Sequence, residues 1–177
     1  YGYTDLLQMI TQYNVKGGIE AGLVQYWNEV FEKIAVDSMV GALSGETALE
    51  IGDGTDAFAL DMVIDAKASA GSTGRRFKNL IVNSSTRAKM EKMQLNSFIP
   101  ASETNIGFDM WAGYKVIESD SVPSGQSIIA GDGAIAFGQV TPNGLISIET
   151  ERKANGANGG GGDVLHTRRS VVAHPQG

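Results

Sequence analysis

The chain has 177 residues, of which 42% are hydrophobic and 19% charged, a balance typical of a folded protein with a buried core. Its formal net charge of -6 argues against nucleic acid as a primary partner, because phosphate binding needs clustered cations. The absence of cysteine excludes a disulfide framework and thiolate metal sites. No apolar run is long enough to span a bilayer and no basic, apolar leader opens the chain, so no membrane partner is expected.

The N-terminal part of the sequence predicts two helices. The first 13 residues have a helical pattern and include a short amphipathic helix, and the missing start methionine indicates a piece of a longer protein. A much longer helix is predicted over residues 18–43, after Gly17 and before the stop signal Gly45. At about 25 residues it would be about 38 Å long. Its apolar stripe needs a partner of matching length, so we expect Trp27 and Val30 to pack against the strands predicted over residues 145–151 and 165–173.

The middle of the chain predicts an α/β unit. Residues 44–57 form a loop in which Asp53 and Asp56 could coordinate a cation, but the EF-hand pattern is absent and the preferred interpretation is a connector. Thr55 or Asp56 would then cap a helix over residues 58–70. A buried strand over residues 79–83 follows, and then a helix that is capped by Ser84, Ser85 or Thr86 and continues through Met93.

From residue 98 onward, strands and turns are predicted. Residues 99–113 form a loop with two aromatic side chains, followed by strands over residues 114–119 and 127–131. Asn143-Gly144 is a strong hairpin signal that precedes the strand over residues 145–151. Residues 152–163 are rich in glycine and predict a flexible loop that buries nothing. One long strand ends the chain and is stopped by Pro175.

The residues offer little for catalysis. His166 and His174 are eight apart and would share one face of an unbroken strand, but no third ligand lies at a recognisable spacing. No nucleophile elbow occurs. The glycine-rich stretches around Asp132 and over residues 159–162 do not continue to the lysine of a phosphate-binding loop. We therefore predict no catalytic, cofactor-binding or metal-binding residue, and no enzyme.

Several segments in order resemble the major capsid proteins of tailed bacteriophages, which have the Hong Kong ninety-seven-type fold. The matching segments are GYKVIESDSVP, IIAGDGAIAFG and ISIETERKANGANGGGGDVLHTRRSVVAHPQG, with LIVNSSTRAKMEKMQL and the helix QYWNEVFEKIAVDSMVGALSG upstream. They include a Glu-x-x-Arg motif from Glu149 to Arg152 and an Arg-x-Val-x-x-His-Pro ending from Arg169 to Pro175. Two positions differ from the family pattern: Asn83-Ser84 replaces the more usual histidine-serine, and Gln176 follows the His-Pro pair.

The resemblance implies an α+β subunit with two domains. A peripheral domain over residues 1–50 and 145–173 would contain a long spine helix packed on antiparallel strands. An α/β axial domain would cover residues 51–144 and 174–177. The family's N-terminal arm and extended loop would precede Tyr1 and are not in this sequence.

The function that the resemblance implies is self-assembly. The subunit would form pentamers and hexamers of an icosahedral phage or prophage head in the bacterial cytoplasm and remain in the virion capsid. A scaffold protein or a maturation protease could take part, and contact with nucleic acid would be weak at most. Encapsulin compartments share the fold, so a cargo shell is the main alternative. A small-ligand-binding or hydrolytic α/β domain is the less favoured one.

Two arginine pairs, Arg75-Arg76 and Arg168-Arg169, stand out in an otherwise acidic chain. They are either solvated surface charges or partners of carboxylates on a neighbouring subunit, and both alternatives stay open. The complete set of candidate interface residues is Arg75, Arg76, Phe108, Trp111, Glu149, Glu151, Arg152, Arg168 and Arg169.

Overall fold

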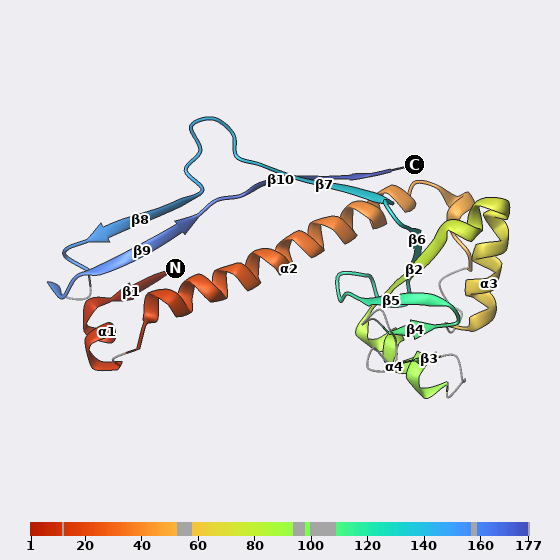
Figure 1. The fold of residues 1–177 in the computed structure, drawn as a ribbon, viewed down its shortest axis with the longest axis horizontal. Coiled ribbons are helices and arrows are strands. Elements are labelled where there is room, and N and C mark those ends of the chain that lie inside the picture. Colours follow the sequence, from red (N-terminus) through yellow and green to blue (C-terminus); the bar gives the residue numbers. More distant parts are fainter. Residues whose placement is uncertain (12, 53–57, 94–97, 100–108, 157–158, 177) are drawn as a thin grey trace. The chain divides into compact units, whose positions relative to one another are not determined.

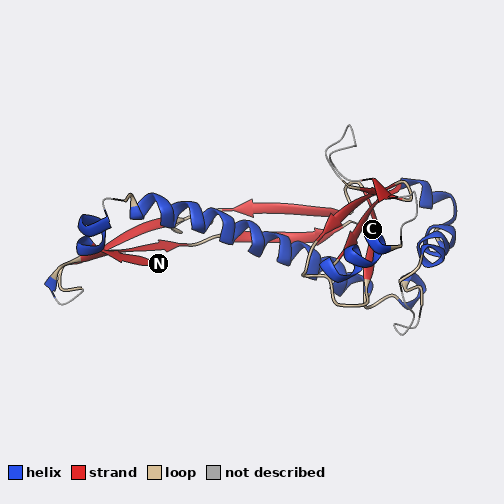
Figure 2. Ribbon diagram, turned by 90° about the horizontal axis from the view of Figure 1, so that it is seen from below, coloured by secondary structure: helices blue, strands red, loops and turns tan. Residues whose placement is uncertain are grey.

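The computed structural model describes residues 1–11, 13–52, 58–93, 98–99, 109–156 and 159–176. The chain divides into two compact units, and each combines an earlier with a later part of the sequence (Figure 1). Unit 1 contains Tyr1–Phe31 and Phe137–Val172, and unit 2 contains Glu32–Ala136 and Ala173–Gly177. Helices and strands occur in both units (Figure 2), which confirms the predicted α+β class. In the part of the chain described, no helix is long and apolar enough to cross a membrane.

Unit 1 contains a three-stranded antiparallel sheet in the order β1-β9-β8. The strands are β1 (Gly2–Thr4), β9 (Gly162–Thr167) and β8 (Ile148–Lys153). The helix predicted at the start of the chain is shorter than expected, because only α1 (Asp5–Thr11) is helical. The three residues before it pair with β9 instead, with Gly2 opposite Val164 and Thr4 opposite Gly162.

The long helix is α2 (Val15–Leu43), which begins three residues earlier than predicted. Asn14 causes the early start, since its side chain accepts a hydrogen bond from the backbone N–H of Gly17 at 3.0 Å, as an N-cap residue does. The glycine therefore lies inside the helix rather than before it. The predicted contact of Trp27 with the strand over residues 165–173 is confirmed, because Nε1 of Trp27 donates to Oγ1 of Thr167 at 3.0 Å. The contacts expected for Val30 and for residues 145–151 stay predictions. Trp27 is half-buried, and Leu23 on the same stripe is buried.

Unit 2 contains a five-stranded mixed sheet in the order β3-β4-β5-β2-β6. Strand β2 (Phe77–Val82) lies between β5 (Tyr114–Glu118), to which it is parallel, and the edge strand β6 (Ser127–Gly131), to which it is antiparallel. The other two strands are β3 (Phe98–Ile99) and β4 (Met110–Trp111). The helices are α3 (Leu60–Ser69) and α4 (Ser84–Lys92), with short 3-10 turns η1 (Thr47–Leu49) and η2 (Gly71–Arg76).

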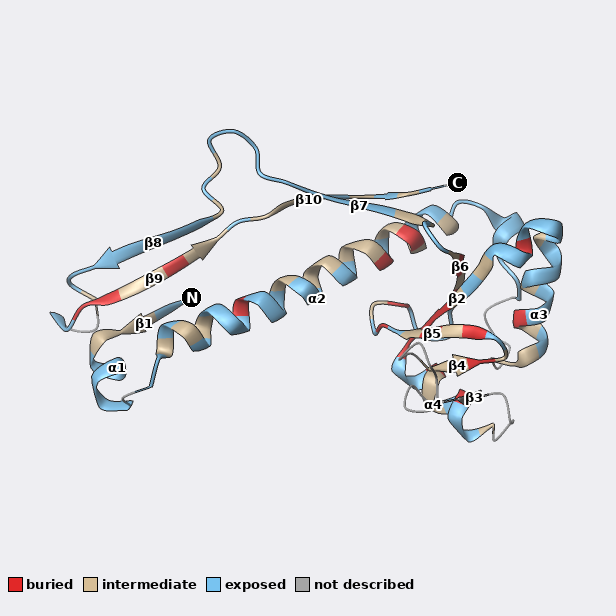
Figure 3. Ribbon diagram, viewed as in Figure 1, coloured by how far each residue is buried: buried red, intermediate tan, exposed pale blue. Residues whose placement is uncertain are grey.

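The second half of β2, residues 80–82, is buried on both faces, as its apolar run predicts (Figure 3). Leu80 and Val82 join one core with Val63, Met90, Trp111, Tyr114 and Val116. Ile81 points to the opposite face, where it packs with Val36, Met39, Val122 and Ile128. The last turns of α2 therefore belong to the second core, and Val36 is one of the most buried residues of that core.

Both predicted helix caps in this unit are wrong. The residue before α3 is Ala59, which has no capping side chain, and the predicted cap candidates Thr55 and Asp56 lie outside the described residues, as does Asp53. Helix α4 is capped by Asn83, whose side chain accepts from the backbone N–H of Thr86 at 2.9 Å. Asparagine caps as well as serine does, and Asn83 is the residue with extended backbone.

The hairpin predicted at Asn143-Gly144 does not form. A local turn is present, since Gly144 has φ +86° and Leu145 N donates to Pro142 O at 3.0 Å. However, β7 (Ile135–Val140) pairs with β10 (Ser170–Pro175), whereas β8 pairs with β9. Residues 141–147 separate β7 from β8, which is too long a connection for a two-residue hairpin.

The predicted final strand is broken and the predicted glycine-rich loop is shorter than expected. Arg168 and Arg169 separate β9 from β10, although Pro175 does end the last strand. Of residues 152–163, the first two belong to β8 and the last two to β9. Gly161 and Gly162 are buried, which contradicts a loop that buries nothing.

Close approach of neighbouring atoms explains why glycine occurs at positions 161 and 162. A Cβ atom on Gly162 would lie 2.7 Å from the carbonyl oxygen of Tyr3, and one on Gly161, at φ +76°, would lie 2.8 Å from Nη2 of Arg152. Real Cβ atoms do not approach backbone atoms so closely, so Gly162 lets β1 reach β9.

We predict that Gly162→Ala destabilises unit 1 by about 1–3 kcal/mol, because the methyl group overpacks the β1–β9 contact. Gly138→Ala in β7 is the matched control, since a Cβ there meets nothing within 4 Å. Urea unfolding of both variants measures the difference, and equal stabilities would contradict the close-approach argument.

We also predict that Met90→Ala lowers the free energy of unfolding by about 2–5 kcal/mol, because the side chain is fully buried in the core of unit 2. Ile64→Ala on α3 is the control. Its side chain is 53% exposed, so the change should stay within about 0.5 kcal/mol. Chemical denaturation checks both values, and a Met90→Ala effect no larger than that of the control would place Met90 outside the core.

Candidate functional site

One face of the β8–β9 pair in unit 1 carries a row of charged side chains. Glu149 lies opposite His166 in the strand register, and alternate residues of a strand share a face. Arg168 donates from Nη1 to Oε2 of Glu149 at 2.9 Å, and Nε2 of His166 lies 3.1 Å from Oε2 of Glu151. These four residues are thus paired within the chain. Three of them, Glu149, Glu151 and Arg168, were predicted interface residues. All are substantially exposed, so each pair contributes little to stability.

The opposite face of β8 carries Arg152, which joins three parts of unit 1. Its Nη1 atom donates to Oδ1 of Asp5 at 2.8 Å and to Oδ1 of Asp163 at 3.2 Å, and its Nη2 atom contacts Oδ2 of Asp5. The hydroxyl of Tyr3 donates to Oδ2 of Asp163 at 3.1 Å. Arg152 therefore connects α1 to the β8–β9 pair within one chain.

The charges of this group shift its proton affinities. The hydrogen bonds to Asp5 and Asp163 raise the pKa of Arg152, and the hydrogen bond from Arg152 keeps the pKa of Asp5 below its ordinary value of 3.8. Desolvation, together with the hydrogen bond to Asp163, raises the pKa of Tyr3. The charged forms of Arg152 and Asp5 are therefore favoured in the folded state.

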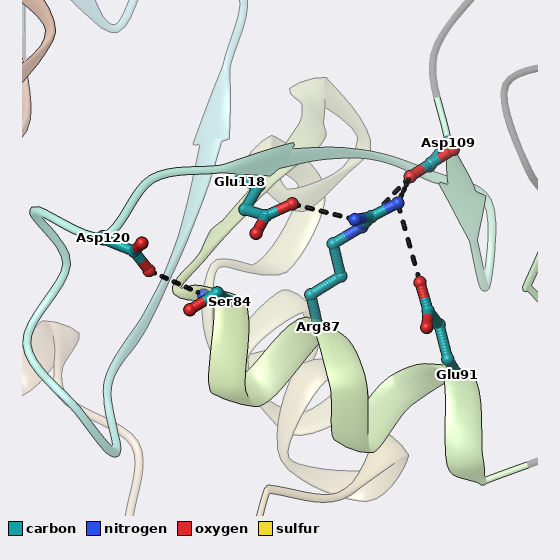
Figure 4. A network of polar contacts seen from close by, with 6 residues as sticks. All are labelled: Ser84, Arg87, Glu91, Asp109, Glu118 and Asp120. Carbon is teal, nitrogen blue, oxygen red and sulfur yellow. Dashed lines mark hydrogen bonds and ion pairs between the residues drawn. The ribbon is translucent and has the colours of Figure 1, made fainter. Parts of the chain in front are cut away.

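A second polar network, which sequence reasoning missed, surrounds Arg87 in unit 2 (Figure 4). Arg87 extends from α4 and donates to Asp109 from Nε at 3.1 Å and to Glu118 from Nη1 at 2.9 Å. Its third partner is Glu91, one turn further along α4, at 3.6 Å. The hydrogen bond to Asp109 is the main cause that raises the pKa of Arg87. Only the Arg87–Glu91 spacing of four residues was visible in the sequence.

The same network continues to the start of α4. The backbone N–H of Ser84 donates to Oδ1 of Asp120 at 3.0 Å, and the hydrogen bonds from Ser84 lower the pKa of this carboxyl group (Figure 4). A carboxylate at a helix N-terminus is favoured because the first N–H groups lack helical partners. Asp120 and Glu118 therefore attach α4 to the end of β5.

The remaining candidate interface residues have different environments. Arg75 and Arg76 are exposed in the last turn of η2, and within the described residues neither forms an ion pair. Arg169 is half-buried between β9 and β10. Trp111 has no exposed surface and packs in the core of unit 2, so the prediction of an interface side chain is wrong at this position. Phe108 lies outside the described residues.

The two histidines lie on different strands, His166 on β9 and His174 on β10, so the shared face of one unbroken strand does not exist. Among the residues that the structure describes, no three His, Asp or Glu side chains are grouped so that they could hold a metal ion. The two polar networks instead join elements of the same unit, and their exposed members form charged surfaces.

Comparison with known proteins shows a distant similarity over nearly the whole chain. The chain is similar to a protein named major capsid protein from Bacillus phage SPP1, with 25% identity over 187 aligned residues. The alignment covers 98% of this chain and 56% of the relative, so the chain spans about half the length of the relative. No family model matches the chain.

We predict that Asp5 stabilises unit 1 in a pH-dependent way. Because the folded-state pKa of Asp5 is lowered, its stabilisation is present above the unfolded pKa and is lost as the pH falls through the lower folded value. Asp5→Asn should therefore be less stable than the parent at neutral pH, and the difference should shrink in acid.

Urea unfolding across this pH range measures that difference, with Asp37→Asn, at an exposed position of α2, as the control. A difference that does not change with pH would contradict the assignment of the stabilisation to the charged form of Asp5.

Proposed function

We propose that this protein is a structural subunit of a phage or prophage head, of which many copies associate into an icosahedral shell around the genome. The observation that carries the proposal is the similarity to the Bacillus phage SPP1 major capsid protein, which extends over nearly the whole chain. A shell needs a large number of moderate contacts rather than a catalytic centre. The proposed role is accordingly not enzymatic.

The order of structural elements supports the proposed Hong Kong ninety-seven-type fold. The long helix α2 precedes a mixed α/β unit, and the last strands of the chain return to the sheet and helix of unit 1. In this proposal unit 1 contains most of the peripheral domain and unit 2 most of the axial domain. The shell would consist of pentamers and hexamers, assembled in the bacterial cytoplasm and retained in the virion, with a scaffold protein or maturation protease as further partners.

The polar contacts refine the choice of interface residues. Arg152 is engaged by Asp5 and Asp163, and Arg168 by Glu149, so reversing either charge would disturb contacts within unit 1 as well as any contact between subunits. Arg75, Arg76 and Arg169 have no such partner among the described residues. These three arginines are therefore the better candidates for contacts with a neighbouring copy.

The test is the assembly state of the full-length protein. We expect negative-stain microscopy of the purified full-length product to show closed shells, and sedimentation to place most of the protein in them. Arg169→Glu should reduce the shell fraction, because like charges brought together at an interface cost several kcal/mol. Its thermal melt should stay close to that of the parent.

Other outcomes separate the alternatives. A full-length protein that remains monomeric under assembly conditions would contradict the shell proposal. Closed shells that contain a protein cargo instead of nucleic acid would favour an encapsulin-like compartment.

A further inference from the structure

One end of the unit 2 sheet carries a fixed pair of cations, Arg75 and Arg76, which we call the basic turn. The turn follows α3, and its backbone is held closely there, since a Cβ atom on Gly74 would lie 2.3 Å from the carbonyl oxygen of Lys67. On the other side, a Cβ atom on Gly131 would lie 3.1 Å from the carbonyl oxygen of Arg76. The backbone that carries the two exposed guanidinium groups is therefore anchored at both ends.

The other end of the sheet is acidic. Three carboxylates, those of Glu91, Asp109 and Glu118, surround the single guanidinium of Arg87 (Figure 4). A fourth, Asp120, binds the backbone N–H of Ser84 at the start of α4, and we call these four residues the carboxylate cluster. The side chains of Glu91 and Glu118 are 49% and 41% exposed, so they are accessible to a partner. Lys89 and Lys92 lie in the last turn of α4, away from the end at which Asp120 binds Ser84.

Strand β2 separates the two charged groups. The basic turn ends at Arg76, directly before β2, and α4 begins at Ser84, directly after it. Strand β5 is parallel to β2 and places Glu118 opposite Val82, at the same end as α4. Six residues of strand span roughly 20 Å, whereas an ion pair requires about 4 Å. The basic turn and the carboxylate cluster therefore cannot meet within one copy.

We propose that the basic turn of one copy docks on the carboxylate cluster of a neighbouring copy. The proposal rests on the proposed function and names one contact within it. Two different surfaces at opposite ends of the same unit make a head-to-tail contact, which closes into a ring when the rotation between copies is suitable. Charge complementarity would mainly set the orientation and the association rate of the copies.

The test uses the full-length protein with the charge of the basic turn reversed, Arg75→Glu/Arg76→Glu. Both residues are exposed and without an ion pair in the described chain, so the thermal melt should not change. We expect the fraction of protein in rings or shells to fall roughly tenfold or more, the change that about 1.4 kcal/mol per contact produces. Lys16→Glu/Lys33→Glu, at two exposed positions of α2, is the control with the same change in net charge.

Rescue identifies the partner surface. Adding Glu91→Lys/Glu118→Lys to the reversed basic turn restores opposite charges at the two ends, so assembly should return. Three outcomes would each overturn this contact while leaving the shell proposal intact. The first is that Arg75→Glu/Arg76→Glu assembles as well as the wild type, and the second is that the lysine control loses as much assembly. The third is that the quadruple variant folds but does not assemble. A wild-type protein that does not assemble would overturn both.

Discussion

Burial of β2 on both faces is the constraint on which unit 2 depends. Leu80 and Val82 lie in one core and Ile81 in the other, so helices and strands must cover the strand from both sides. The covering elements include α3 and α4 on one face and the last turns of α2 on the other. Because η2 leads into β2 and α4 follows it, the same strand fixes the positions of the basic turn and of the carboxylate cluster.

Unit 1 depends more on close backbone contact and on charge than on a large core. Its buried apolar side chains in the described part are Leu23 and Leu165, whereas every residue of β8 is exposed. Gly162 lets Tyr3 approach β9, and Arg152 connects Asp5 to Asp163 across the sheet. A unit built in this way leaves polar and apolar surface available, as the proposed association with other copies would require.

The sequence predicted the elements whose signals are local and repetitive. The helical spacing of α2 and the apolar run of β2 were found because each reports burial directly. The pairing of the strands was not predicted, since Asn143-Gly144 specifies a turn but does not determine which strands pair beyond it. The Arg87 network was also missed, because Asp109 and Glu118 come from elements far from α4 in the sequence. Composition alone misjudged Gly161 and Gly162, which are buried and closely packed rather than part of a flexible loop.

The assembly of each unit from two distant sequence segments has a consequence for synthesis. Trp27 and its partner Thr167 are 140 residues apart, so the partner leaves the ribosome about 7–28 s later at about 5–20 residues per second. During that interval the part of α2 around Trp27 lacks the strand β9 that contacts it, and nascent chains are exposed to aggregation and to chaperones. The delay also separates translation from association, because a chain without β8 and β9 has not yet formed the sheet of unit 1.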